Sequence, residues 1–261
     1  MKDLVNNNGK GPFGGEPVLS DQDHGDISPE AVLDVAMQHF ASVGFSDTKL
    51  ENIAKDSGMS KRMIHYHFGD KRGLYNRCLA RAVSYLRPTK EEMQVESSVP
   101  VEGIRRIVEA LFRCFVAHPE AVRLLIMENL LHFGKVTDRR ILSDKSEVIL
   151  QLDKLLMKGQ DSGAFRPGIS AQDVFTLIVS IAVFRISNRS ITMNLYGVDT
   201  MDEDNTAGMA RMACDATLAF LTSNLKSSSD KVSYLTVSQS EETELIDESD
   251  STYDIDGAVF E

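Results

Sequence analysis

The chain has 261 residues, of which 42% are hydrophobic, and this is enough apolar material to bury a core in one large or two small domains. Such a composition excludes a chain that is disordered or fibrous throughout. The formal net charge of -11 argues at first against a nucleic-acid partner, because Lys and Arg supply the phosphate contacts on which that binding depends.

The positive charge, however, is concentrated in one segment. Residues 48–90 contain ten Lys and Arg against three Asp and Glu, whereas residues 1–47 and 226–261 are both strongly acidic. Local clustering of positive charge, rather than the total, is the electrostatic signature of a DNA contact. The sequence therefore predicts that residues 48–90 include a DNA-binding surface.

No run of about 18 apolar residues occurs, and the first residues lack the apolar segment of a secretory signal. Cys78, Cys114 and Cys214 are widely spaced and form no C-x-x-C pair. We therefore expect a cytoplasmic protein with reduced thiols, no cofactor, no metal and no membrane partner.

Residues 1–26 are rich in Gly, Asn and Asp and carry no periodic apolar pattern, so we expect a disordered leader. A helix then begins, because Ser28 is a good N-cap, Pro29 suits a first turn, and apolar residues recur every three or four positions. Gly44 is expected to end this helix.

Two short helices follow. Thr48 begins the T-x-x-E pattern of a capping box, and Gly58 is expected to close this helix. Ser60 caps the next helix, after a short turn that contains glycine, and such a pair is typical of a helix-turn-helix. A further helix is predicted from its cap, Asp70, to about Leu86.

The helix after Ser60 has two unlike faces. At about 100° per residue, Ile64 and Phe68 fall on one side, and Arg62, His65 and Tyr66 fall on the other. An exposed basic face can be merely solvated, but the short turn and the local positive charge favour DNA contact, in which an Arg can address guanine with two hydrogen bonds. His65 and His67 point about 200° apart and cannot chelate one metal ion.

Residues 29–87 contain a set of positions whose order and spacing are specific. They are Gly44-Phe45, Thr48, Ile53-Ala54, Ser60, His65-Tyr66-His67-Phe68, and Lys71 with Leu74. In these positions the segment resembles the DNA-binding domain of the TetR family of bacterial regulators. The resemblance implies an all-α protein, in which an N-terminal helix-turn-helix three-helix domain (27–87) precedes a larger helical ligand-binding and dimerisation domain (88–225).

The resemblance also implies which residues touch DNA. Thr48 would contact a phosphate, Lys61 to Met63 would face bases, and Tyr66 and Lys71 would hold the backbone. His65 stands where the family usually has tyrosine, and a protonated imidazole could replace that phosphate contact at mildly acidic pH. The expected DNA-binding residues are Thr48, Lys49, Ser60, Lys61, Arg62, Met63, His65, Tyr66 and Lys71.

The second half of the chain predicts further helices near 101–117, 119–133, 138–159, 170–195 and 205–225, separated by turn signals. No strand pattern of useful length competes with them. Residues 226–261 are Ser-rich and acidic, so we expect a disordered tail there.

Ligand-binding residues are harder to identify, because an apolar stripe at helical spacing is usually core. An apolar run leads into Arg185 and Asn188, and a charged side chain there needs a partner or water. Acids of another helix or of the other subunit are one possible partner, and a polar ligand is the other. The candidate ligand-binding residues are Phe112, Phe115, Met127, Phe184, Arg185 and Asn188.

The last predicted helix contains Ala207, Ala210, Ala213 and Ala216, small residues that allow another helix to approach closely. With the preceding long helix it would form a four-helix dimer interface, as the resemblance implies. The leading interpretation is a homodimeric repressor that an unknown small-molecule effector releases from a palindromic double-stranded DNA operator.

The alternatives are a helical enzyme and a helical interaction protein without DNA binding. The sequence contains no nucleophile elbow, phosphate-binding loop or H-E-x-x-H motif, so we expect no enzyme activity.

Overall fold

The computed structural model describes residues 28–93, 99–134, 147–224 and 233–235. Every regular element in these ranges is an α-helix, which confirms the all-α fold class. The N-terminal helices are α1 (Pro29–Asp47), α2 (Leu50–Ser57), α3 (Lys61–Phe68) and α4 (Lys71–Tyr85). They are followed by α5 (Lys90–Met93), α6 (Pro100–Ala117), α7 (Pro119–Leu131), α9 (Glu147–Asp161), α10 (Ala171–Ser187), α11 (Arg189–Tyr196) and α12 (Glu203–Thr222).

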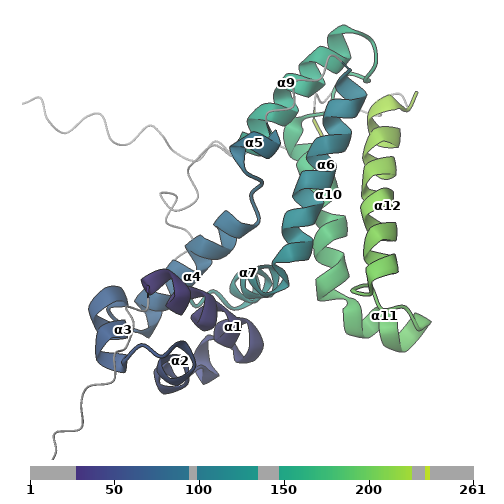
Figure 1. Cartoon of the computed structure of the whole chain (residues 1–261). Helices are drawn as coiled ribbons and strands as arrows, with labels where there is room; N and C mark the ends of the chain where they lie inside the picture. Colours follow the sequence, from purple (N-terminus) through teal and green to yellow (C-terminus); the bar gives the residue numbers. More distant parts are fainter. Residues whose placement is uncertain (1–27, 94–98, 135–146, 225–232, 236–261) are drawn as a thin grey trace, which may run out of the picture.

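The molecule is elongated (Figure 1). Helices α1 to α4 pack together at one end, while α6, α9, α10 and α12 lie beside one another at the other end. Helix α7 lies between these two groups of helices.

Local sequence signals set most helix ends in the N-terminal part. Ser28, Ser60 and Asp70 each accept a hydrogen bond from the backbone N–H three residues on, at 3.2, 3.3 and 2.7 Å, so these three predicted caps are confirmed. Gly58 ends α2 with a φ of 76°, the left-handed conformation that glycine adopts without a steric penalty.

The predicted capping box at Thr48 is wrong. Helix α2 begins after Lys49, whose side chain makes no cap hydrogen bond. Thr48 is only 2% exposed, and its hydroxyl donates back to the carbonyl oxygen of Gly44 at 2.6 Å. Gly44 has a φ of 81° and kinks the chain, yet helical structure resumes after it as far as Asp47.

The helices enclose two apolar cores. The N-terminal core consists mainly of α1 to α4, and it also includes Ala121 and Leu124 of α7. The C-terminal core is formed by α6, α9, α10 and α12, and Val122 of α7 belongs to it. Helix α7 therefore belongs to both cores, and the N-terminal core extends past the domain boundary predicted near residue 88.

In the second half of the chain, the structure differs from the predicted helices in two places. The predicted helix 170–195 is two helices, α10 and α11, which meet at Asn188 with a bend of 68°. The short helix α5 was not predicted. Residues 138–146 of the predicted helix 138–159, the expected leader 1–26 and most of the expected tail lie outside the described residues.

No single helix in the described ranges is long and apolar enough to cross a membrane. Helices α10 and α11 meet that length and composition test only together, as the bent pair.

Candidate DNA-binding surface

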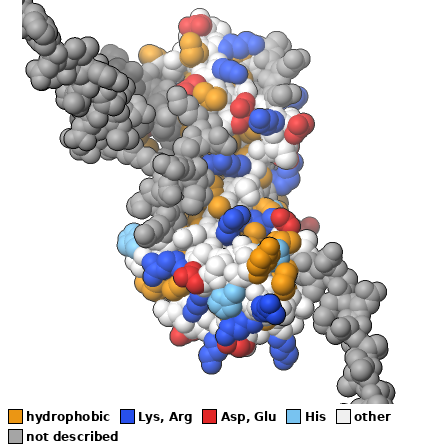
Figure 2. Space-filling model, turned by 90° about the vertical axis from the view of Figure 1, so that its left-hand side faces the viewer, with side chains coloured by type: hydrophobic (Ala, Val, Ile, Leu, Met, Phe, Trp, Pro, Cys, Tyr) orange, Lys and Arg blue, Asp and Glu red, His pale blue; other side chains and the backbone are white. Residues whose placement is uncertain are grey.

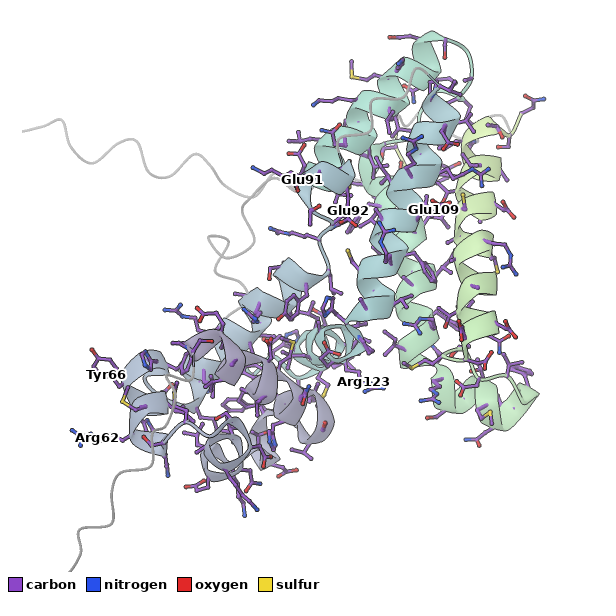
Figure 3. The ribbon with its side chains drawn as sticks, viewed as in Figure 1. Arg62, Tyr66, Glu91, Glu92, Glu109 and Arg123 are labelled. Carbon is purple, nitrogen blue, oxygen red and sulfur yellow. The ribbon has the colours of Figure 1, made fainter. Side chains whose placement is uncertain are left out.

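Helix α3 presents the two faces that the sequence predicts. Ile64 and Phe68 are buried in the N-terminal core, and they fix the helix against its neighbours. Arg62 and Tyr66 project away from the molecule, and Tyr66 is 79% exposed (Figure 3). The apolar side of α3 is buried against the N-terminal core, so its polar side faces solvent and can enter a DNA groove.

Positive charge surrounds this helix. In the space-filling view, Lys and Arg side chains gather on the lower part of the molecule, which α1 to α4 form (Figure 2). Lys49, Lys61, Arg62 and Arg72 are all exposed there. A surface of this kind attracts phosphates and raises the rate of encounter with DNA.

Two of the lysines already have partners. Lys61 donates to the carboxylate of Glu51 on α2, and its hydrogen bond is the largest cause of the lowered pKa of that carboxyl. Lys71 donates to the carbonyl oxygen of Ser46 at 3.0 Å and lies 4.8 Å from the centre of the Phe45 ring. Exposed pairs of this kind contribute little to stability, so DNA phosphates can compete for these lysines.

Arg62 differs from both lysines, since it has no hydrogen bond or ion pair within the part of the chain that the structure describes. Its guanidinium carries five N–H donors in a planar fork. It is therefore the side chain of α3 best prepared to bind a base edge.

His65 has a defined local role. Its Nδ1 lies 2.6 Å from the carbonyl oxygen of Gly69. Because a carbonyl only accepts, Nδ1 must carry the proton, and in the neutral ring Nε2 is then an acceptor. A phosphate contact through Nε2 would therefore require a protonated His65.

Thr48 does not lie on this surface. Its hydroxyl is buried and directed at Gly44, so in this arrangement it cannot reach a phosphate. The other residues that the sequence assigned to DNA lie on or beside α2 and α3, and the structure brings them to one end of the molecule.

The candidate ligand-binding residues are less well grouped. Phe112 and Phe115 lie in the C-terminal core, and the carbonyl of Phe115 contacts Arg185. Phe184 is 45% exposed, and Met127 lies against Gly44 of α1. Within the described structure, a side-chain hydrogen bond joins Arg185 to Phe115, and the backbone N–H of Asn188 donates to the Phe184 carbonyl oxygen at the end of α10.

Two clusters of polar side chains, which the sequence did not indicate, lie where α1 and α4 meet α7. Glu128 is only 4% exposed, and its carboxylate accepts hydrogen bonds from Tyr75 and from the backbone N–H of Gly134, each at 3.0 Å. Nearby, Arg81 and Tyr85 both donate to Asp34.

The pKa of Asp34, in the second of these clusters, is set by two opposing effects. Burial raises its pKa, but the hydrogen bonds from Arg81 and Tyr85 outweigh that effect and leave the pKa below its ordinary value. The Tyr85 ring also stacks on His118 at the start of α7, with 4.3 Å between ring centres. No short motif marks these residues, because their partners are about 33 to 53 positions away in sequence.

Among the described residues, no group of three His, Cys, Asp or Glu side chains is placed to hold a metal ion.

Two family models match this chain. Residues 32–78 match the model for bacterial regulatory proteins of the tetR family, and residues 100–217 match the tetracyclin repressor-like C-terminal domain. The first match covers α2, α3 and most of α1 and α4, and the second covers the helices that enclose the C-terminal core.

Curated relatives agree with these models. The chain is 28% identical over 196 residues to the transcriptional repressor NicS of Pseudomonas putida, a match that covers 74% of this chain and 92% of NicS. It is 29% identical over 139 residues to the transcriptional regulator RutR of Escherichia coli, covering 53% of this chain and 64% of RutR.

Solved structures share the fold. FadR of Bacillus subtilis, crystallised with stearoyl-CoA, superposes with a TM-score of 0.56 at 14% identity, over 74% of this chain and all of FadR. A transcriptional regulator of Streptomyces coelicolor, SCO4942, gives a TM-score of 0.53 at 21% identity, over 74% of this chain and 97% of that one. With its exposed basic helix α3, this chain is a DNA-binding transcription regulator and belongs to the TetR family.

Proposed function

We propose that this regulator is a repressor, that it binds a palindromic operator as a homodimer, and that a small-molecule effector releases it. The observation that carries the proposal is α3, which is anchored by two buried apolar residues and exposes Arg62 and Tyr66 on a positively charged surface. A helix presented in this way fits the major groove, where base edges can be distinguished.

The residues that we assign to the operator lie at the N-cap of α2, at the N-cap of α3 and within α3, and at the first position of α4. Arg62 and Met63 would meet base edges, while the longer cations around them would bind phosphates, which fix position without reading sequence. The assigned residues are Lys49, Ser60, Lys61, Arg62, Met63, His65, Tyr66 and Lys71.

The dimer would form through α10 and α12. Thr176, Ser180, Phe184 and Ser187 are all exposed and follow one another at helical spacing along α10, so a row of mostly small side chains faces outward. On α12, which lies beside α10, small residues such as Ala207 and Ala219 are exposed as well. A second copy could pack closely on this surface, as small residues let helices approach each other.

A signal from an effector would travel through α7. This helix contributes to both cores, and its Glu128 is hydrogen-bonded to Tyr75 of the DNA-binding part. A shift of α7 would therefore change how the two α3 helices of a dimer are spaced, and the spacing must match the operator half-sites.

The experiment is a gel-shift titration of the full-length protein with DNA from its own upstream region, compared with a scrambled fragment. Arg62→Ala should weaken operator binding and relax the preference at one base pair by about 1–3 kcal/mol. Lys71→Ala is the matched control, since it should weaken binding to all sequences equally and reduce the salt dependence.

Equal losses on every sequence for Arg62→Ala would show that Arg62 binds phosphate and reads no base. If the wild-type protein does not discriminate the operator from scrambled DNA, a helical interaction protein without operator binding becomes the better interpretation.

A further inference from the structure

A buried guanidinium in the C-terminal helices has no counter-charge among the residues that the structure describes. Arg185, near the end of α10, is only 2% exposed. Its Nη1 donates to the Thr206 hydroxyl and its Nη2 to the Phe115 carbonyl, both at the long distance of 3.4 Å, and its Nε has no hydrogen-bond partner. Within the described ranges no Asp or Glu forms an ion pair with it, and burial lowers its pKa with no opposing charge.

This arrangement is unfavourable as it stands. The guanidinium stays protonated in proteins, so Arg185 cannot escape its burial by losing a proton. A buried charge without a partner is strongly destabilising, and a buried N–H without an acceptor adds to that. An anion that binds here would relieve both penalties at once.

The chain itself shows how an occupied site of this kind looks. Arg81 uses its Nε and Nη2 to bind the two oxygens of Asp34, at 2.7 and 2.9 Å. Arg189 binds Asp199 through the same two atoms, at 2.8 and 2.7 Å. On Arg185 no carboxylate of the described residues binds this edge of the guanidinium, where the hydrogen bonds given by those residues amount to the long one from Nη2 to Phe115.

The surroundings suit one end of a small organic acid. Arg185 contacts α6 and α12, which lie beside α10 (Figure 1). Phe115 belongs to the apolar C-terminal core, and Thr206, in the first turn of α12, places a hydroxyl beside the guanidinium. An acid with an apolar body would combine a charged contact with burial in this core.

We propose that Arg185 is the anion-binding residue of the effector site, and that its Nε and Nη2 bind the carboxylate of a small organic acid side-on. The proposal rests on the proposed function, since it names the chemical class of the effector. It also gives the ligand a route of action. The acid would draw Nη2 from the Phe115 carbonyl, three residues before His118, which joins α6 to α7.

The test compares acetate, the smallest suitable carboxylate probe, with its neutral counterpart acetamide. Thermal unfolding of the full-length protein is followed at constant ionic strength, with acetate replacing chloride. Arg185→Met removes the charge but keeps an apolar side chain. Arg189→Met is the matched control, because Arg189 is exposed and its guanidinium already holds Asp199.

Acetate should raise the Tm of the wild-type protein by about 2–4 °C at roughly tenfold its dissociation constant, and acetamide should not. The Arg189→Met variant should respond as the wild type does, and the Arg185→Met variant should not respond. Without acetate, Arg185→Met should melt at the same temperature as the wild type or above it, because the unpaired charge is gone.

Two results would overturn the proposal. One is an acetate response that is absent from the wild type or equal in all three proteins. The other is a Tm of Arg185→Met several degrees below that of the wild type without acetate, which would mean that a carboxylate of this chain or of a second copy already pairs with Arg185. A gel shift on the same wild-type preparation reports separately whether operator binding, and with it the proposed function, stands.

Discussion

At the scale of single residues, Tyr75 and Glu128 form a buried hydrogen bond between positions 53 residues apart. Burial raises the pKa of Tyr75, and the hydrogen bond to Glu128 raises it further, so the phenol stays protonated and acts as the donor. The carboxylate has no cation among its described contacts and depends on the Tyr75 hydroxyl and the Gly134 N–H. This hydrogen bond ties α4 of the DNA-binding part to α7.

We predict that Tyr75→Phe lowers the free energy of unfolding by about 1–3 kcal/mol, because the buried carboxylate loses one of its donors. Urea denaturation measures the change. Glu128→Ala, which removes the acceptor, examined alone and together with Tyr75→Phe, completes a double-mutant cycle in which we expect a coupling of about 0.5–3 kcal/mol. Strictly additive effects would show that the hydrogen bond does not join the two residues energetically.

Asp34 carries a pH-dependent contribution to stability. Its pKa is held below the ordinary value of 3.8, so the contribution is fully present above that value and is lost as the pH falls through the lower pKa of the folded state. The Asp34 side chain is 43% exposed, so solvent screening keeps the contribution small.

Asp34→Asn should therefore destabilise the protein by about 1 kcal/mol or less at pH 7, and the difference from the wild type should begin to shrink as the pH falls below about 4 and go on shrinking toward the lower pKa of the folded state. Melting curves of both proteins between pH 7 and pH 3 measure this. A difference that stays constant down to pH 3 would mean that the charge of Asp34 has no part in it.

At the scale of elements, α3 is a helix of only eight residues, and helices this short are not stable alone. It depends on its cap, Ser60, and on two apolar residues buried beneath it. The cap also sets the position of Lys61 to Met63, which we propose contact DNA, so we expect stability and recognition to depend on the same residue.

Ser60→Ala should reduce stability by about 0.5–2 kcal/mol, since the N–H of Met63 loses its acceptor, and it should weaken operator binding as well. Ser60→Asn restores an acceptor and should recover most of the stability. Chemical denaturation and gel shift together measure both effects. If Ser60→Ala leaves both unchanged, the cap is not needed to form α3.

At the scale of the whole molecule, residues 233–235 of the acidic C-terminal segment pack against α10 and α12. The Ser233 hydroxyl and the Leu235 N–H donate to Asp173 near the N-terminus of α10, at 3.0 and 2.9 Å, and the Tyr234 ring lies 5.5 Å from that of Phe220. Phe220 is near the end of α12 that lies farthest from α3 (Figure 1). These contacts hold residues 233–235 away from the candidate DNA-binding surface.

We predict that a protein truncated after residue 226 remains a dimer, because α10 and α12 are retained, and that its operator affinity follows the full-length curve across a salt series. Light scattering and gel shift measure the two properties. Tighter operator binding by the truncated protein at low salt, with convergence at high salt, would identify the acidic segment as a competitor for the basic surface. A monomer would contradict the proposed dimer interface.

Elements that depend on near neighbours could be predicted from the sequence. The caps at Ser28, Ser60 and Asp70 and the two faces of α3 follow from residues within four positions of one another, where geometry is fixed by the helix. A capping pattern is only a local preference, however. The Thr48 hydroxyl does not cap α2, because it is buried and donates instead to the carbonyl oxygen of Gly44, where α1 is kinked.

Contacts between distant residues, in contrast, depend on how the helices pack together. Periodicity shows that a helix has an apolar face, but it does not identify the helix that covers the face. For this reason α7 could not be assigned to both cores, and the hydrogen bond of Tyr75 with Glu128 could not be foreseen. The same holds for two arginines four positions apart, because packing placed a carboxylate against Arg189, whereas none of the described carboxylates lies against the buried Arg185.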